Sequence, residues 1–80
     1  MRLLVFTDES EESQRQKQIA WGVARRFPQV EVVELPLTGE EAQRRGIPRA
    51  PAVVAEGFIL SVGKLLSAGQ LRRFLERKVA

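Results

Sequence analysis

Two serines three residues apart are the side chains whose placement could support chemistry. Ser10 and Ser13 follow the short apolar run 3–6 and stand where a helix is expected to begin. A hydroxyl pair at such a place could act as a nucleophile, provided that a neighbouring base activates it. The simpler interpretation is that Ser10 is the N-cap of the helix, since its hydroxyl can accept a hydrogen bond from the first turn. We favour the capping role.

Four carboxylates surround these serines, namely Asp8, Glu9, Glu11 and Glu12. Carboxylate oxygens are good ligands for divalent cations. The four are not spaced as in a known metal-binding loop, however, and acidic residues are also favoured at the positive end of a helix dipole. We therefore expect an acidic, solvated helix start and no metal site.

The residue types that are missing exclude most catalytic machinery. The chain has no cysteine, no histidine and no tyrosine. Without cysteine there is no disulfide, no thiolate nucleophile and no Cys metal site. Without histidine the usual general base and the commonest metal ligand are absent. We predict a protein that is not an enzyme and needs no cofactor.

The segment around Pro51 is the most informative part of the sequence. Ala50-Pro51 is followed by the apolar run 52–55, the turn Glu56-Gly57 and a second apolar run 58–62. Proline cannot pair within a sheet, so it marks the first residue of a strand. An X-Pro bond is also the place where a cis peptide is energetically accessible. This order of parts predicts a loop, a proline and a tight hairpin.

The remaining elements follow from periodicity and from start and stop signals. Residues 30–35 are predicted to form a strand that Pro36 stops, and Pro28 ends the preceding helix. Thr38 with Glu41, and Ser67 with Gln70, have the spacing of capping boxes. The predicted strands are 3–6, 30–35, 52–55 and 58–62, and the predicted helices are 10–27, 38–45 and 67–78. The order β-α-β-α-β-β-α indicates an α/β fold, a four-stranded mixed sheet flanked by three helices on both faces.

Length and charge limit the class of protein. Eighty residues form one domain, 1–80, and no apolar run approaches the roughly 20 residues of a membrane span. The start of the chain is too short for a signal peptide, so we expect a cytoplasmic protein. Thirteen Lys and Arg against ten Asp and Glu leave a net charge of only +3. Frequent Arg and Glu are also compatible with a thermophilic source.

Three segments together resemble the thioredoxin-like superfamily, most closely its small glutaredoxin-like members. These are Leu4–Thr7 with the helix after it, Gly46–Val54 around Pro51, and the hairpin and helix of 56–75. The resemblance covers nearly the whole chain and implies a cis-proline at Pro51. Where the family carries C-x-x-C, this sequence reads Ser10-Glu11-Glu12-Ser13. Dithiol exchange needs a sulfur nucleophile with a lowered pKa, so the resemblance implies a redox-inactive domain.

We therefore expect a protein- or peptide-binding or assembly module with an unknown protein partner, in which Ser10, Ser13 and Pro51 occupy the vestigial active-site positions. Trp21, Arg49 and Ala50 are the candidate contact residues, and a homodimer is a further possibility. One alternative is an accessory to a thiol oxidoreductase whose partner supplies the cysteines. Nucleic acid binding through the Arg-rich helices is a third, and it is disfavoured by interleaved Glu and scarce aromatic residues.

Overall fold

The computed structural model describes residues 1–79 and has the predicted order of elements. The strands are β1 (Arg2–Thr7), β2 (Glu31–Pro36), β3 (Ala52–Ala55) and β4 (Phe58–Val62), and the helices are α1 (Glu11–Ala24), α2 (Glu40–Arg45) and α3 (Ala68–Val79). None of the helices in this range is both long and apolar enough to cross a membrane. The α/β class and the mixed sheet are therefore confirmed.

The four strands form one sheet in the order β2-β1-β3-β4. β1 is central, parallel to β2 and antiparallel to β3, and β3 and β4 form an antiparallel hairpin. The hairpin turn is Glu56-Gly57, with φ of 51° and 82°. Positive φ at both central residues gives the turn the twist that a two-residue hairpin needs. The Glu56-Gly57 turn is thus confirmed as predicted.

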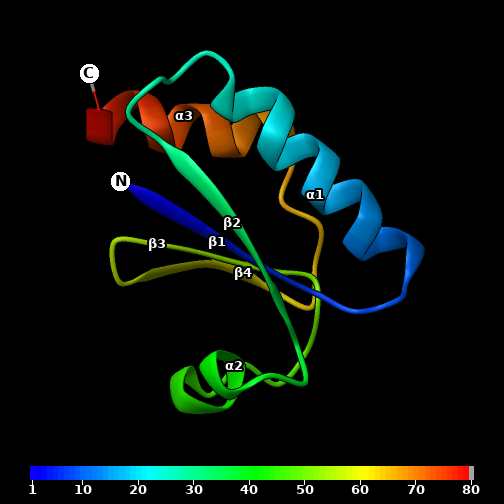
Figure 1. Ribbon diagram of the computed structural model, residues 1–80. Helices are drawn as coiled ribbons and strands as arrows, with labels where there is room; N and C mark the ends of the chain where they lie inside the picture. Colours follow the sequence, from blue (N-terminus) through cyan, green and yellow to red (C-terminus); the bar gives the residue numbers. More distant parts are fainter. Residues whose placement is uncertain (80) are drawn as a thin grey trace.

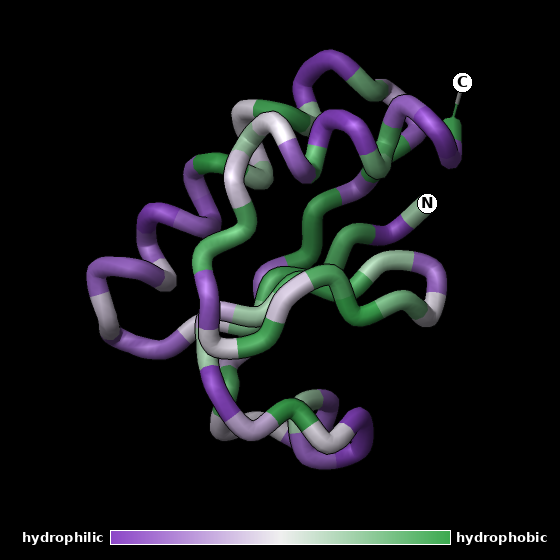
Figure 2. The backbone as a smooth tube through the Cα atoms, turned by 180° about the vertical axis from the view of Figure 1, so that it is seen from behind, coloured by the Kyte–Doolittle hydropathy of each residue, from purple (hydrophilic) through white to green (hydrophobic). Residues whose placement is uncertain are grey.

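Helices cover both faces of the sheet, as expected. Figure 1 shows α1 and α3 side by side over one face and α2 alone over the other. Each face has its own apolar core. The first contains Leu3, Val5, Ala20, Val53, Ala55, Leu66, Leu71 and Leu75. The second contains Phe6, Ala42, Ile47, Ala52 and Val54. The hydropathy colouring of Figure 2 agrees: the strands inside are largely green, and the outer turns of the helices are purple.

Two predicted helix boundaries are wrong. α1 ends at Ala24 and not at Phe27, although the side chain of Phe27 still packs against the first core. The predicted capping box of Thr38 and Glu41 does not form, because Gly39 is the N-cap of α2 and no side chain caps it. The Ser67 and Gln70 box does form, with Gln70 N donating to Ser67 Oγ and Ser67 N donating to Gln70 Oε1, both at 3.1 Å.

Candidate functional site

The candidate site lies at the edge of the sheet where β1 and β2 end. Phe6 pairs with Leu35 on one side and with Ala52 on the other, so the end of β1 lies between the end of β2 and the start of β3. Pro51, directly before Ala52, is buried, and its peptide bond to Ala50 is cis, as the resemblance implied. α1 begins at the same edge. The carboxyl ends of parallel strands are the usual binding edge of α/β sheets.

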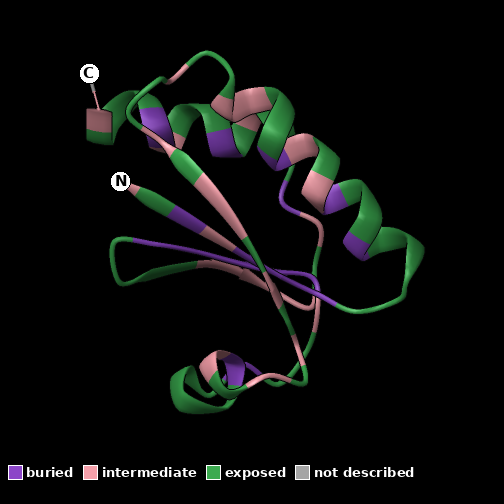
Figure 3. Cartoon of the chain, in the orientation of Figure 1, coloured by how far each residue is buried: buried purple, intermediate pink, exposed green. Residues whose placement is uncertain are grey.

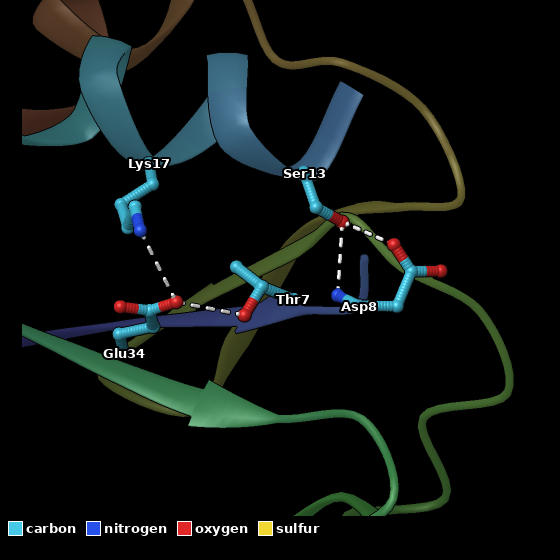
Figure 4. A network of polar contacts seen from close by, with 5 residues as sticks. All are labelled: Thr7, Asp8, Ser13, Lys17 and Glu34. Carbon is cyan, nitrogen blue, oxygen red and sulfur yellow. Dashed lines mark hydrogen bonds and ion pairs between the residues drawn. The ribbon is translucent and has the colours of Figure 1, made fainter. Parts of the chain in front are cut away.

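A hydrogen-bonded cluster joins the end of β1 to the first turn of α1. The carboxylate Oδ1 of Asp8 accepts from Ser13 Oγ at 2.8 Å and from both the backbone N–H and the hydroxyl of Ser10. The backbone N–H of Asp8 in turn donates to Ser13 Oγ at 3.1 Å, as Figure 4 shows. The Ser13 N–H donates to Ser10 Oγ at 3.2 Å, so Ser10 is the N-cap, as predicted.

This cluster occupies both hydroxyls with structural hydrogen bonds. Ser13 is fully buried, whereas Ser10 and Asp8 are exposed. The hydroxyl and backbone N–H of Ser10, followed by the Ser13 hydroxyl, lower the pKa of the Asp8 carboxyl, because each stabilises the ionised form. A carboxylate with a lowered pKa is a weak general base. The geometry therefore supports a structural role, in which the cluster holds the start of α1 against the end of β1, rather than activation of a nucleophile.

A second polar contact lies beside the cluster and was not found from the sequence. Thr7 Oγ1 donates to Glu34 Oε2 at 3.0 Å, and Lys17 Nζ lies 3.6 Å from the same oxygen (Figure 4). The three residues come from β1, β2 and α1. The only signal in the sequence is that Glu34 carries a charge within a strand that is rich in apolar residues. Within residues 1–79, no three or more acidic, His or Cys side chains are grouped to hold a metal ion.

A shallow groove of about 630 Å³ opens next to these contacts. It lies between the β1–α1 loop and the β2–α2 turn. Three of its lining residues are acidic and none is basic. The lining is Thr7, Asp8, Glu9, Ser10, Gln14, Glu34, Pro36, Leu37 and Thr38. The groove thus contains Ser10, whereas Ser13 and Pro51 are buried and do not line it.

The predicted contact residues do not all gather at this site. Ala50 and Arg49 directly precede Pro51, and the stem of Arg49 lies so close to Gly63 that a Cβ there would come within 3.3 Å of it. Gly63 has a φ of 71° and donates its N–H to Pro51 O at 2.8 Å, so the proline loop is tied to the end of β4. Trp21 lies elsewhere, on the exposed side of α1, with Lys17 Nζ 5.8 Å from its ring centroid.

Comparison with known proteins bears on the fold alone. No family model matches the chain, and no curated protein sequence matches it either. A solved structure described as "Structure of a malarial protein" is similar over 99% of this chain and 97% of that one, with a TM-score of 0.75. The sequence identity is 12%. At that identity the likeness shows a shared arrangement of helices and strands.

Proposed function

We propose that this chain is a redox-inactive thioredoxin-like domain that binds an extended segment of a partner protein at the edge formed by the Pro51 loop and the groove. Support comes from the order of the elements, from the strand order β2-β1-β3-β4, and from Ser10 and Ser13 at the start of α1. The thioredoxin-like superfamily carries its cysteines at the start of that helix. Here the two hydroxyls serve the fold, and the surface beside them stays open.

The observation that carries this proposal is the groove adjoining the serine positions. A domain of this fold without sulfur retains the part of the site that holds a polypeptide. An extended peptide gains affinity chiefly from backbone hydrogen bonds, which need no cysteine. The carboxylates of Asp8, Glu9 and Glu34 favour a basic segment, because opposite charges accelerate and orient an encounter.

A peptide titration tests the binding proposal. We would record amide spectra of the ¹⁵N-labelled protein with an alternating Lys-Val peptide and with a matched Glu-Val peptide. The basic peptide should shift the amides of residues 7–10 and of Arg49, Ala50 and Ala52, and the acidic one should shift them far less. A Glu34→Gln variant should bind the basic peptide more weakly, whereas Trp21→Ala should bind it as the parent does. Shifts confined to the outer side of α1, or none with either peptide, would refute the proposal.

Restoring sulfur tests the assignment of the site independently. Ser10 and Ser13 lie in contact across the first turn of α1. We therefore expect the double variant Ser10→Cys/Ser13→Cys to form a disulfide and to reduce insulin slowly, whereas the parent chain shows no turnover. Adding Asp8→Asn should speed the reaction, because the Asp8 carboxylate disfavours a neighbouring thiolate. A folded double variant that stays a dithiol in an oxidising glutathione buffer would contradict the assignment.

A further inference from the structure

β4 is an edge strand whose free side carries none of the residues that usually protect an edge. Its sequence is Phe58-Ile59-Leu60-Ser61-Val62, without charge and without proline. Phe58 and Ile59 are 51% and 55% exposed, and with Trp21 they are the large apolar residues most open to solvent. An uncharged apolar edge offers its unpaired backbone groups to another strand.

The opposite edge of the same sheet is protected. β2 contains Glu31, Glu34 and Pro36, and charges and prolines are the common means of preventing edge pairing. β4 has a single irregularity instead, a register shift between the pairs Val54–Ile59 and Val53–Ser61. A bulge of this kind bends a strand and shortens the regular ladder without removing its free groups. Pairing is therefore open at β4 and closed at β2.

The charges at the two ends of β4 indicate what would pair with it. Glu56 precedes the strand, Lys64 follows it, and both are exposed. Neither is in an ion pair with any other residue of 1–79. If two β4 strands lie antiparallel about a two-fold axis at Leu60, the strand end next to Glu56 in each copy meets the strand end next to Lys64 in the other. The edge is thus complementary to itself, in charge as well as in apolar character.

We infer that a second copy of this chain docks on β4, so that two four-stranded sheets join through an antiparallel β4–β4 ladder. The pairing covers Ile59 and the outer side of Phe58. The ring centroid of Phe58 lies 6.3 Å from that of Phe74 and 4.6 Å from Lys78 Nζ. A two-fold contact uses the same surface on both copies and closes on itself. Because β2 is protected, the assembly stops at two copies.

The expected dimer is weak and forms with rising concentration. β4 has five residues and a bulge, so the ladder buries less than the roughly 1,200 Å² of a standard stable interface. The surface is separate from the groove beside Ser10, so this inference stands whether or not the proposed peptide binding is correct. An Ile59→Lys variant that is monomeric but still shows the peptide shifts would separate the two proposals.

Sedimentation equilibrium from about 10 μM to about 1 mM tests the dimer, since this range brackets the weak affinities expected. The parent chain should pass from monomer to dimer. Lys64→Glu and Glu56→Lys should each weaken association about tenfold, because two cross-strand attractions become repulsions. The double variant Glu56→Lys/Lys64→Glu should restore it. Arg15→Glu, which changes the net charge as Lys64→Glu does but lies on α1, should leave association unchanged.

Several results would overturn the inference. A parent chain that stays monomeric throughout the range would do so, as would species larger than a dimer, because they require a second contact surface. If Arg15→Glu weakened dimerisation as much as Lys64→Glu does, the effect of Lys64→Glu would come from net charge and not from pairing across β4. Ile59→Lys should abolish the dimer and Ile59→Thr should retain part of it. Since Ile59 is half exposed, both variants should keep the parent's circular dichroism spectrum.

Discussion

The two faces of the sheet are covered to very different degrees. On the face under α1 and α3, the side chains of Leu3, Val5 and Val53 are completely buried. On the face under α2, Leu4 and Val33 are only partly buried, and a hollow of about 340 Å³ lies over them. In Figure 3, β2 carries only the intermediate and exposed colours along its length. One sheet therefore has a closed face and a partly open one.

The difference follows from helix length. α1 and α3 have 14 and 12 residues; α3 buries Leu71 and Leu75, and α1 buries Ala20 together with the polar Ser13 and Gln16. α2 has six residues, and Ala42 is the only one of them that is buried. A helix rises about 1.5 Å per residue, so α2 is too short to cover strands of five or six residues along their whole length. Most of the apolar stabilisation must come from the first face.

A matched pair of leucine truncations would test this contrast with the largest expected effect. Leu71 on α3 is fully buried, so Leu71→Ala should lower the free energy of unfolding by about 3–4 kcal/mol through lost transfer energy and a cavity. Leu35 on β2 is partly exposed beside the hollow, so Leu35→Ala should cost about 1–2 kcal/mol. Urea unfolding followed by circular dichroism measures both. Equal losses would mean that the two faces contribute alike.

On both faces, the elements with local sequence signals are the ones that the sequence predicts correctly. The strand 52–55 and the hairpin at Glu56-Gly57 were placed correctly, because proline, apolar run and turn are local signals. The end of α1 was not, since Phe27 keeps the helical spacing but enters the core from beyond the last turn. The start of α2 was missed because the Thr38 and Glu41 spacing fits a capping box that Gly39 replaces.

The candidate site was predicted only as far as its contacts are local. Ser10 as N-cap depends on residues one turn apart and could be predicted. The bond from Thr7 to Glu34 joins residues 27 apart in sequence, so it depends on the register of β1 against β2, which no pattern in the sequence gives. The groove likewise forms between two loops that meet only in the folded chain.

A smaller effect is expected at Gln16, a completely buried polar side chain of α1 that bonds to the loop before α3. Gln16 donates through Nε2 to Leu66 O at 3.1 Å and accepts from Leu66 N at 2.6 Å. Gln16→Leu keeps the bulk but leaves both backbone groups of Leu66 unpaired, which should cost about 2–3 kcal/mol. The exposed Gln18→Leu should change stability by less than about 0.5 kcal/mol. If Gln16→Leu left the free energy of unfolding unchanged, the closed face would depend on apolar packing alone.

The smallest effect concerns the hydrogen bonds from Asp8 to the first turn of α1, at the edge of the closed face. It should appear as a dependence of the free energy of unfolding on pH. The folded-state pKa of Asp8 lies below its ordinary value of 3.8, chiefly because of the Ser10 hydrogen bonds. A lowered pKa means that the ionised carboxylate stabilises the fold above pH 3.8 and that this contribution disappears as the pH falls through the folded-state value. Asp8→Asn should therefore be less stable than the parent chain at neutral pH.

The difference in the free energy of unfolding between the Asp8→Asn variant and the parent chain should become smaller in acid. Asparagine keeps a carbonyl acceptor for Ser10 and Ser13, so what differs between the two proteins is mainly the charge. Urea unfolding at a series of pH values would follow this difference, which should disappear below pH 3.8. Glu9→Gln is the matched control, because it removes a neighbouring charge that lies outside the serine cluster. A difference for Asp8→Asn that stays constant with pH would mean that the carboxylate acts through its shape, and that α1 is held by packing on the closed face alone.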